Sequence, residues 1–117
     1  MADPKYLSNW KDVCIGQPAA VLGGGPSLWG DMARLPANCM LIAVNYHAFH
    51  FCQPTFMVYN DHPGSDPLLD QAIQEHRAIL VSPDQTSDIL FDVDVWTGFY
   101  SSNTAAWFGL WLGCDPV

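Results

Sequence analysis

Four short apolar runs constrain the fold of this chain more than any other feature of its sequence. Each run is continuous rather than alternating, which is typical of strands that are covered on both faces. The runs span Ala19 to Leu22, Met40 to Val44, Phe56 to Tyr59 and Ala78 to Val81. Because segments of helical character separate them, we predict an α/β domain with right-handed crossovers and a mostly parallel sheet of about four or five strands.

The helical segments are predicted from capping residues and apolar stripes. The clearest runs from Asp66 to His76, where Asp66 can cap the helix and Pro67 suits its first turn. A last helix from Asn103 to Leu112 is apolar all round, which predicts that it is buried or faces another subunit, and Gly113 is expected to end it. Shorter helices are expected at Ser8 to Ile15, Ser27 to Leu35 and Tyr46 to Cys52, and a short strand at Ile89 to Phe91.

Length and composition limit the classes of protein and partner. The 117 residues predict one domain, 1–117, and the charged share of 14% is below the usual quarter, so we expect apolar surface that a copy of the chain covers in a homo-oligomer. The formal charge of −8 argues against a nucleic-acid ligand, because no basic stripe is present to replace counterions. A small anion would have to be held by backbone amides and helix ends.

The cysteines and the N-terminus predict a cytoplasmic protein. The four cysteines are widely spaced and lie beside apolar residues, which is typical of free thiols in a reducing compartment. The first residues lack the pattern of a signal peptide, and no apolar run reaches the length that spans a membrane. We therefore expect no membrane association. Separately, no cofactor is expected.

Polar and glycine residues follow the apolar runs where a ligand would bind. In an open parallel sheet, ligands bind beyond the carboxyl ends of the strands. Gly23, Gly24, Gly25 and Ser27 follow the first run, and the helix start at Pro26 makes a phosphate seat that needs no lysine. Asn45 follows the second run, and Asn60 and Asp61 follow the third. The alternative interpretation of the glycines is a tight corner between a strand and a helix, with no ligand.

Four stretches of the chain resemble a known family. They read VLGGGPSL, IAVNYHAF, PTFMVYND and SSNTAAWFGLWLGCDPV, and they are similar to the MptE-like, Rossmann-like proteins common in phage genomes. Relatives of that family include flagellin-glycosylation accessory factors and bacterial sialyltransferases that use CMP-sialic acid. The resemblance covers Ala19 to Asp61 and Tyr100 to Val117, and its most specific part is Gly23 to Leu28. It implies a minimal, three-layer Rossmann-like domain.

The resemblance also implies roles for individual residues. Gly23, Gly25 and Ser27 would contact phosphate, and Asn45 ribose or phosphate. Asp61 would contact ribose hydroxyls or a metal, and Ser102 and Asn103 the nucleotide. The turn from Ser101 to Thr104 departs from the small-residue-glycine turn of the family, and no match to its downstream catalytic histidine is seen.

These features lead to one expected function and two alternatives. We expect a domain that binds a small nucleotide-type anion without catalysis, for example a phage protein that sequesters a nucleotide immune signal. The first alternative is a glycosyltransferase-like or diphosphokinase-like domain that uses a nucleotide substrate. The second is a structural phage protein with no ligand.

Other candidate residues favour simpler explanations. His47, His50 and Cys52 have a spacing that occurs in metal sites, but no second ligand pair lies at a fitting distance, so no metal is expected. His62 beside Asp61 is a candidate general base that lacks a nucleophile. Tyr46 is the best candidate to stack on a base, with core packing as its alternative. The acidic stretch from Asp84 to Asp94 lacks the glycine of a calcium loop, and we expect a solvated loop.

Overall fold

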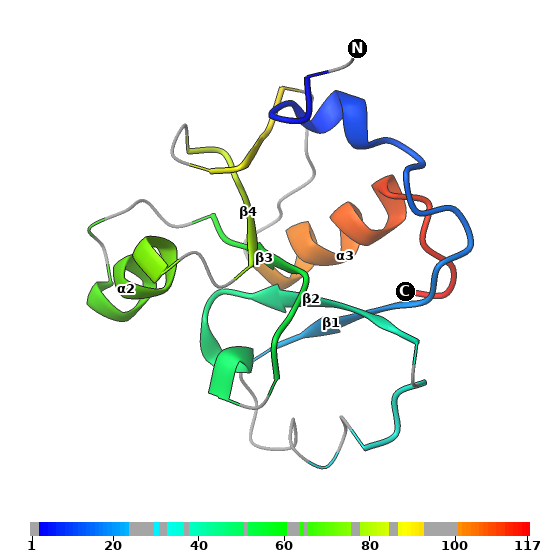
Figure 1. Ribbon diagram of the computed structural model, residues 1–117, viewed down its shortest axis with the longest axis horizontal. Helices are drawn as coiled ribbons and strands as arrows, with labels where there is room; N and C mark the ends of the chain where they lie inside the picture. The colour runs from blue at the N-terminus through cyan, green and yellow to red at the C-terminus, as the bar shows by residue number, and fades with distance from the viewer. Residues whose placement is uncertain are drawn as a thin grey trace.

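The apolar runs form parallel strands, and a fifth strand joins them (Figure 1). The computed structural model describes residues 3–23, 30, 33–36, 38–50, 52–60, 64, 66–75, 78–84, 87–92 and 101–117. The strands are β1 (Ala19–Leu22), β2 (Met40–Val44), β3 (Phe56–Val58), β4 (Ile79–Ser82) and β5 (Ile89–Leu90). Their order in the sheet follows the chain, and every pair is parallel, so the predicted α/β class is confirmed.

The sheet is the middle of three layers. Successive strand residues point to opposite faces. Ile42, Val44, Phe56 and Val58 therefore lie in one core cluster, whereas Ala43 and Met57 lie in the other. The first cluster is covered by α3 (Ser101–Trp111) and by the 3₁₀ helix η1 (Leu7–Trp10), and the second by α2 (Pro67–Glu75) and the 3₁₀ helix η2 (His47–His50). Figure 1 shows α2 and α3 on opposite sides of the strands.

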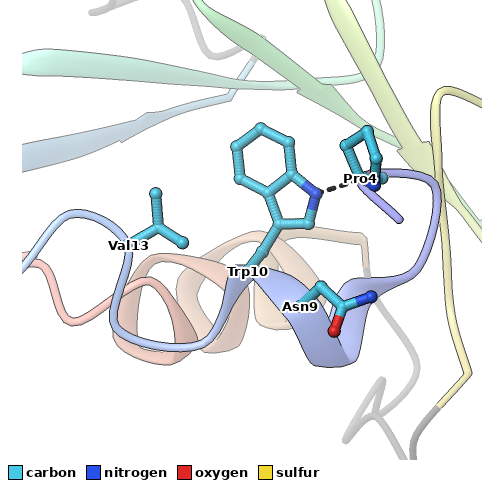
Figure 2. A pocket seen from close by; sticks show the side chains of 4 residues that line it. All are labelled: Pro4, Asn9, Trp10 and Val13. Atoms are coloured by element: carbon cyan, nitrogen blue, oxygen red, sulfur yellow. Dashed lines mark hydrogen bonds between the residues drawn. The ribbon is translucent and has the colours of Figure 1, made fainter. Parts of the chain in front are cut away.

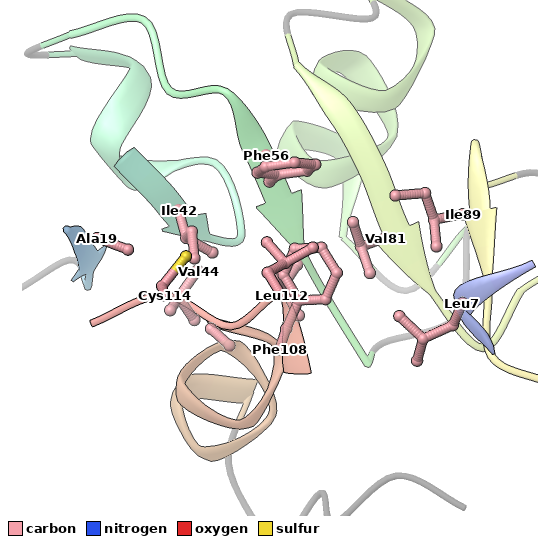
Figure 3. Packing of buried hydrophobic residues seen from close by; sticks show 12 residues of the cluster. Leu7, Ala19, Ile42, Val44, Phe56, Val81, Ile89, Phe108, Leu112 and Cys114 are labelled. Carbon is pink, nitrogen blue, oxygen red and sulfur yellow. The ribbon is translucent and has the colours of Figure 1, made fainter. Parts of the chain in front are cut away.

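The core beneath α3 is dominated by aromatic and aliphatic side chains (Figure 3). Phe108 points from α3 at the sheet, where its ring lies 5.0 Å from that of Phe56 with 76° between the planes. This edge-to-face arrangement is favoured by the ring quadrupoles. Gly109 lets the helix approach closely, because a Cβ there would lie 3.4 Å from Ile42 and 3.1 Å from Val117.

Local capping sets the start of α2 and the end of α3. The Asp66 carboxylate accepts the N–H of Leu68 at 3.0 Å, so the predicted N-cap is confirmed. At the end of α3, Gly113 has φ +83° and donates to the carbonyl of Leu110, while Cys114 donates to that of Gly109. These two bonds make a Schellman motif, which favours glycine at this position.

The helix predicted from Ser8 to Ile15 is wrong over most of its length. Only η1 forms there, and the chain then turns through residues 11–16. The reason is that these backbone donors are used elsewhere. Asp12, Cys14 and Gly16 donate to the carbonyls of residues 111, 112 and 113, respectively. Bonds to the end of α3 thus replace bonds within a helix.

Both edges of the sheet are partly covered by the chain's own ends. At one edge, the N–H of Leu90 donates to the carbonyl of Lys5, and Tyr6 forms a parallel bridge with Leu90. At the other edge, the N–H of Ala19 donates to the carbonyl of Pro116 at 2.9 Å. These contacts satisfy backbone groups that an exposed edge strand leaves unpaired.

The connection from β4 to β5 is much shorter than a usual parallel crossover. Residues 83–88 join the two strands, whereas parallel neighbours are commonly linked by about a dozen residues or more. The carboxylate of Asp88 accepts the N–H of Leu80 at 2.8 Å. The side chain of Asp88 therefore accepts the backbone N–H of Leu80, a β4 residue that is not paired with β5.

Candidate functional site

The carboxyl ends of β1, β2 and β3 bring several predicted residues to one edge of the sheet. Gly23 directly follows β1 and is exposed, Asn45 directly follows β2, and Asn60 lies just beyond β3. The N–H of Asn45 donates to the carbonyl of Val58 at 3.0 Å, which holds the ends of β2 and β3 together. Four predicted residues lie outside the described residues, namely Gly24, Gly25, Ser27 and Asp61.

Asn45 has an unusual backbone and an unsatisfied side-chain oxygen. Its φ of +59° lies in the left-handed region, which asparagine tolerates better than most residues. Its Oδ1 is buried and has no hydrogen-bond partner among the described residues. A buried acceptor without a partner is costly, so this atom is suited to a donor that the described part of the chain does not supply.

Asn60 connects the strand ends to the start of α3. Its Nδ2 donates to Thr104 Oγ1 at 2.9 Å, and Thr104 is fully buried. Its Oδ1, like that of Asn45, is buried and without a partner among the described residues. The bond to Thr104 places the first turn of α3, with the exposed Ser102 and the half-buried Asn103, beside the end of β3.

The first turn of α3 is electrostatically suited to an anion. The N–H groups that begin a helix have no partner within it, and they carry the positive end of the helix dipole. No acidic residue occupies the first turn of α3. The edge therefore combines two classes of group, namely backbone donors for negative oxygens and the Oδ1 acceptors of Asn45 and Asn60 for hydroxyl or amino donors.

Tyr46 is directed toward α2. Its hydroxyl donates to Asp66 Oδ2 at 3.1 Å, and its ring lies 4.4 Å from that of His47 at a tilt of 34°. Loss of water contact raises the pKa of Tyr46, and the hydrogen bond and charge of Asp66 raise it further. The residue predicted to stack on a base thus contacts the start of α2 and His47.

A cluster of buried hydroxyls that was not among the predicted site residues lies beside this edge. The hydroxyl of Ser87 lies within hydrogen-bond distance of those of Tyr59 and Ser82, and Ser82 Oγ also accepts the N–H of Asp84. Tyr59, Ser82 and Ser87 are almost fully buried. The available signal was Ser82, which directly follows the fourth apolar run. Thr104, also missed, is the polar residue on the buried face of the apolar last helix.

The described residues offer no metal centre. Among them, no three histidine, cysteine or acidic side chains are grouped closely enough to hold a metal ion. All four cysteines are free thiols, and burial raises the pKa of Cys52, whose Sγ donates to the Ala48 carbonyl. None of the described helices has the length and apolar character needed to cross a bilayer.

Comparison with known proteins adds no further constraint. No protein-family model, curated protein or solved structure matches this chain.

Proposed function

We propose that this domain binds a small nucleotide-type anion at the carboxyl edge of its sheet, without catalysis. The observation that carries the proposal is the pair of buried oxygens Asn45 Oδ1 and Asn60 Oδ1, which lie just beyond neighbouring strands and have no partner among the described residues. Asn60 is also bonded to Thr104 in the first turn of α3. The oxygens of a phosphate group are mainly hydrogen-bond acceptors, whereas Asn45 Oδ1 and Asn60 Oδ1 need donors. A nucleotide carries hydroxyl and amino donors together with anionic oxygens, so it matches both classes of group.

The side chains of this site favour binding over chemistry. Asn45, Asn60, Ser102 and Asn103 carry amides and hydroxyls, which do not ionise near neutral pH. They can orient a ligand through hydrogen bonds but are poor acids and bases. Together with the phage-family resemblance, this favours a protein that sequesters a nucleotide signal and returns it unchanged.

Titration calorimetry with a panel of nucleotides tests the proposal. The panel includes mononucleotides, cyclic dinucleotides and cyclic ADP-ribose-type signals, and we expect saturable binding of at least one of them. The Asn60→Asp variant keeps the side-chain shape but adds negative charge beside the ligand. We expect it to weaken binding about tenfold or more.

A matched variant controls for the added charge. Asn38 is exposed and precedes β2, at the opposite edge of the sheet, so Asn38→Asp should leave binding unchanged. Flat titrations across the panel would overturn the proposal in favour of a structural protein without a ligand. Release of nucleotide from CMP- or UDP-sugars would overturn the absence of catalysis and support the transferase alternative.

A further inference from the structure

The N-terminal segment carries a hollow and an exposed apolar side chain next to each other. The hollow has a volume of about 180 Å³ and is lined by Pro4, Asn9, Trp10 and Val13 (Figure 2). Two residues beyond Val13, the side chain of Ile15 is 76% exposed, the highest value among the described large hydrophobic residues. We propose that this face, residues 3–17, is the contact between two copies of the chain, with Ile15 of each copy in the hollow of the other.

Hydrogen bonds and packing on the core hold the walls of the hollow in place. Trp10 Nε1 donates to the carbonyl of Pro4 at 2.7 Å, and the Trp10 ring packs at 88° against Phe56 of the core. Asn9 Nδ2 donates to the carbonyl of Asp3 at 2.8 Å. Since these walls are already fixed, little conformational freedom is lost when the hollow is filled.

Ile15 is held with equal firmness. The flanking N–H groups of Cys14 and Gly16 donate to the end of α3 at 2.8 and 3.0 Å. The Ile15 backbone lies against Gly113, where a Cβ would come within 3.2 Å of its Cα. The side chain of Ile15 thus projects into solvent from a fixed backbone, and its exposure carries an energetic cost that burial in an apolar site would remove.

The size and arrangement of the two features fit a two-fold dimer. An apolar cavity of about 150 Å³ can hold a benzene molecule, so the hollow has room for an isoleucine side chain. In a two-fold interface the same surface meets itself, so a projection on one copy can fill the depression beside it on the other. A second copy of the chain is therefore the partner whose shape fits this surface.

Charge also favours this face for self-association. Residues 3–17 contain two aspartates, Asp3 and Asp12, and two lysines, Lys5 and Lys11, so their formal charge is zero. The whole chain carries −8, so all of that negative charge comes from residues outside the segment. Two copies that meet through this segment bring less negative charge together than two copies that meet through another face, so they repel each other less.

Most of the exposed large hydrophobic side chains come from the N-terminal segment and from the last part of the chain. Six large hydrophobic side chains of the described residues are exposed, and five belong to this segment or to the end of α3 and its tail. These five are Tyr6, Val13, Ile15, Leu110 and Val117. A stable interface buries roughly 800 Å² on each partner, so the tail and the end of α3 contribute beside the segment.

Sedimentation velocity of the full chain over a concentration series tests the dimer. We expect a concentration-dependent dimer whose Kd rises more than tenfold in Ile15→Asp, which is the loss expected of an anchoring residue. Val13→Trp, which fills the hollow, should raise Kd similarly. Leu68→Asp is the matched control, because Leu68 is 55% exposed on α2, on the other side of the sheet. The dimer Kd of this variant should differ less than twofold from that of the wild type.

Circular dichroism of each variant checks that the fold is retained. A wild type that sediments as a monomer at every concentration would overturn the proposal. A dimer that responds equally to Ile15→Asp and Leu68→Asp would also overturn it, because the contact would then lie elsewhere. The hollow lies beside the start of β3, away from the carboxyl edge, so nucleotide titrations do not decide this question.

Discussion

Replacing Gly113 with alanine tests how the end of α3 packs against the N-terminal segment. Gly113 has φ +83°, a conformation that costs an L-residue with a Cβ roughly 1 to 2 kcal/mol. The new Cβ would also lie 3.1 Å from Ile15 Cγ1 and 3.2 Å from Asp12 Oδ1, contacts that force a shift costing about 1 kcal/mol more. We expect the free energy of unfolding to fall by about 2 to 3 kcal/mol, equivalent to a Tm lower by about 8 to 12 °C in a domain of this size.

Gly16 offers a matched control within the same chain. Its φ is +76°, but nothing lies within 4 Å of the position that a Cβ would take. Gly16→Ala should therefore lose only the conformational part, roughly 1 to 2 kcal/mol. Urea unfolding monitored by tryptophan fluorescence measures both variants, and equal losses would refute the close packing of Gly113 on residues 12–15.

Two further changes test single contacts. Thr104→Val removes the hydroxyl that Asn60 Nδ2 donates to, so we expect a loss of about 1 kcal/mol in urea unfolding, and unchanged stability would contradict a structural role for that bond. Asp92 accepts hydrogen bonds from the backbone and hydroxyl of Ser8, and these hold its pKa below the usual carboxyl value. The stabilisation is therefore present above the unfolded pKa of about 4 and is lost as the pH falls through the lower folded value. The Tm of Asp92→Asn should therefore lie below that of the wild type at pH 7, and the difference should shrink as the pH is lowered. A difference in Tm that stays constant as the pH falls would show that the charge of Asp92 is not involved.

Local signals in the sequence were enough to predict several elements. The continuous apolar runs became parallel strands, Asp66 caps α2, and Gly113 ends α3, with boundaries within about two residues of those expected. Each of these signals acts within a few residues along the chain, through side-chain alternation, a capping bond or a positive φ. They do not depend on what lies across the molecule.

The site was predicted only in outline. Asn45 and Asn60 follow adjacent strands, so their meeting at one edge follows from a parallel sheet. The bond from Asn60 to Thr104 joins residues that lie 44 positions apart, and no local pattern indicates it. The same holds for Tyr46, which was expected to stack on a base and whose hydroxyl contacts Asp66.

By itself, the sequence determined the α/β class, the parallel strands, the start of α2 and the end of α3, because those depend on hydrophobic periodicity and on backbone conformation at single residues. Only the tertiary structure decided the order of the strands, the loss of the helix after Trp10, and the unsatisfied oxygens of Asn45 and Asn60. Each of these depends on which distant groups compete for the same hydrogen bonds and the same apolar surface. That competition is settled when the layers pack together.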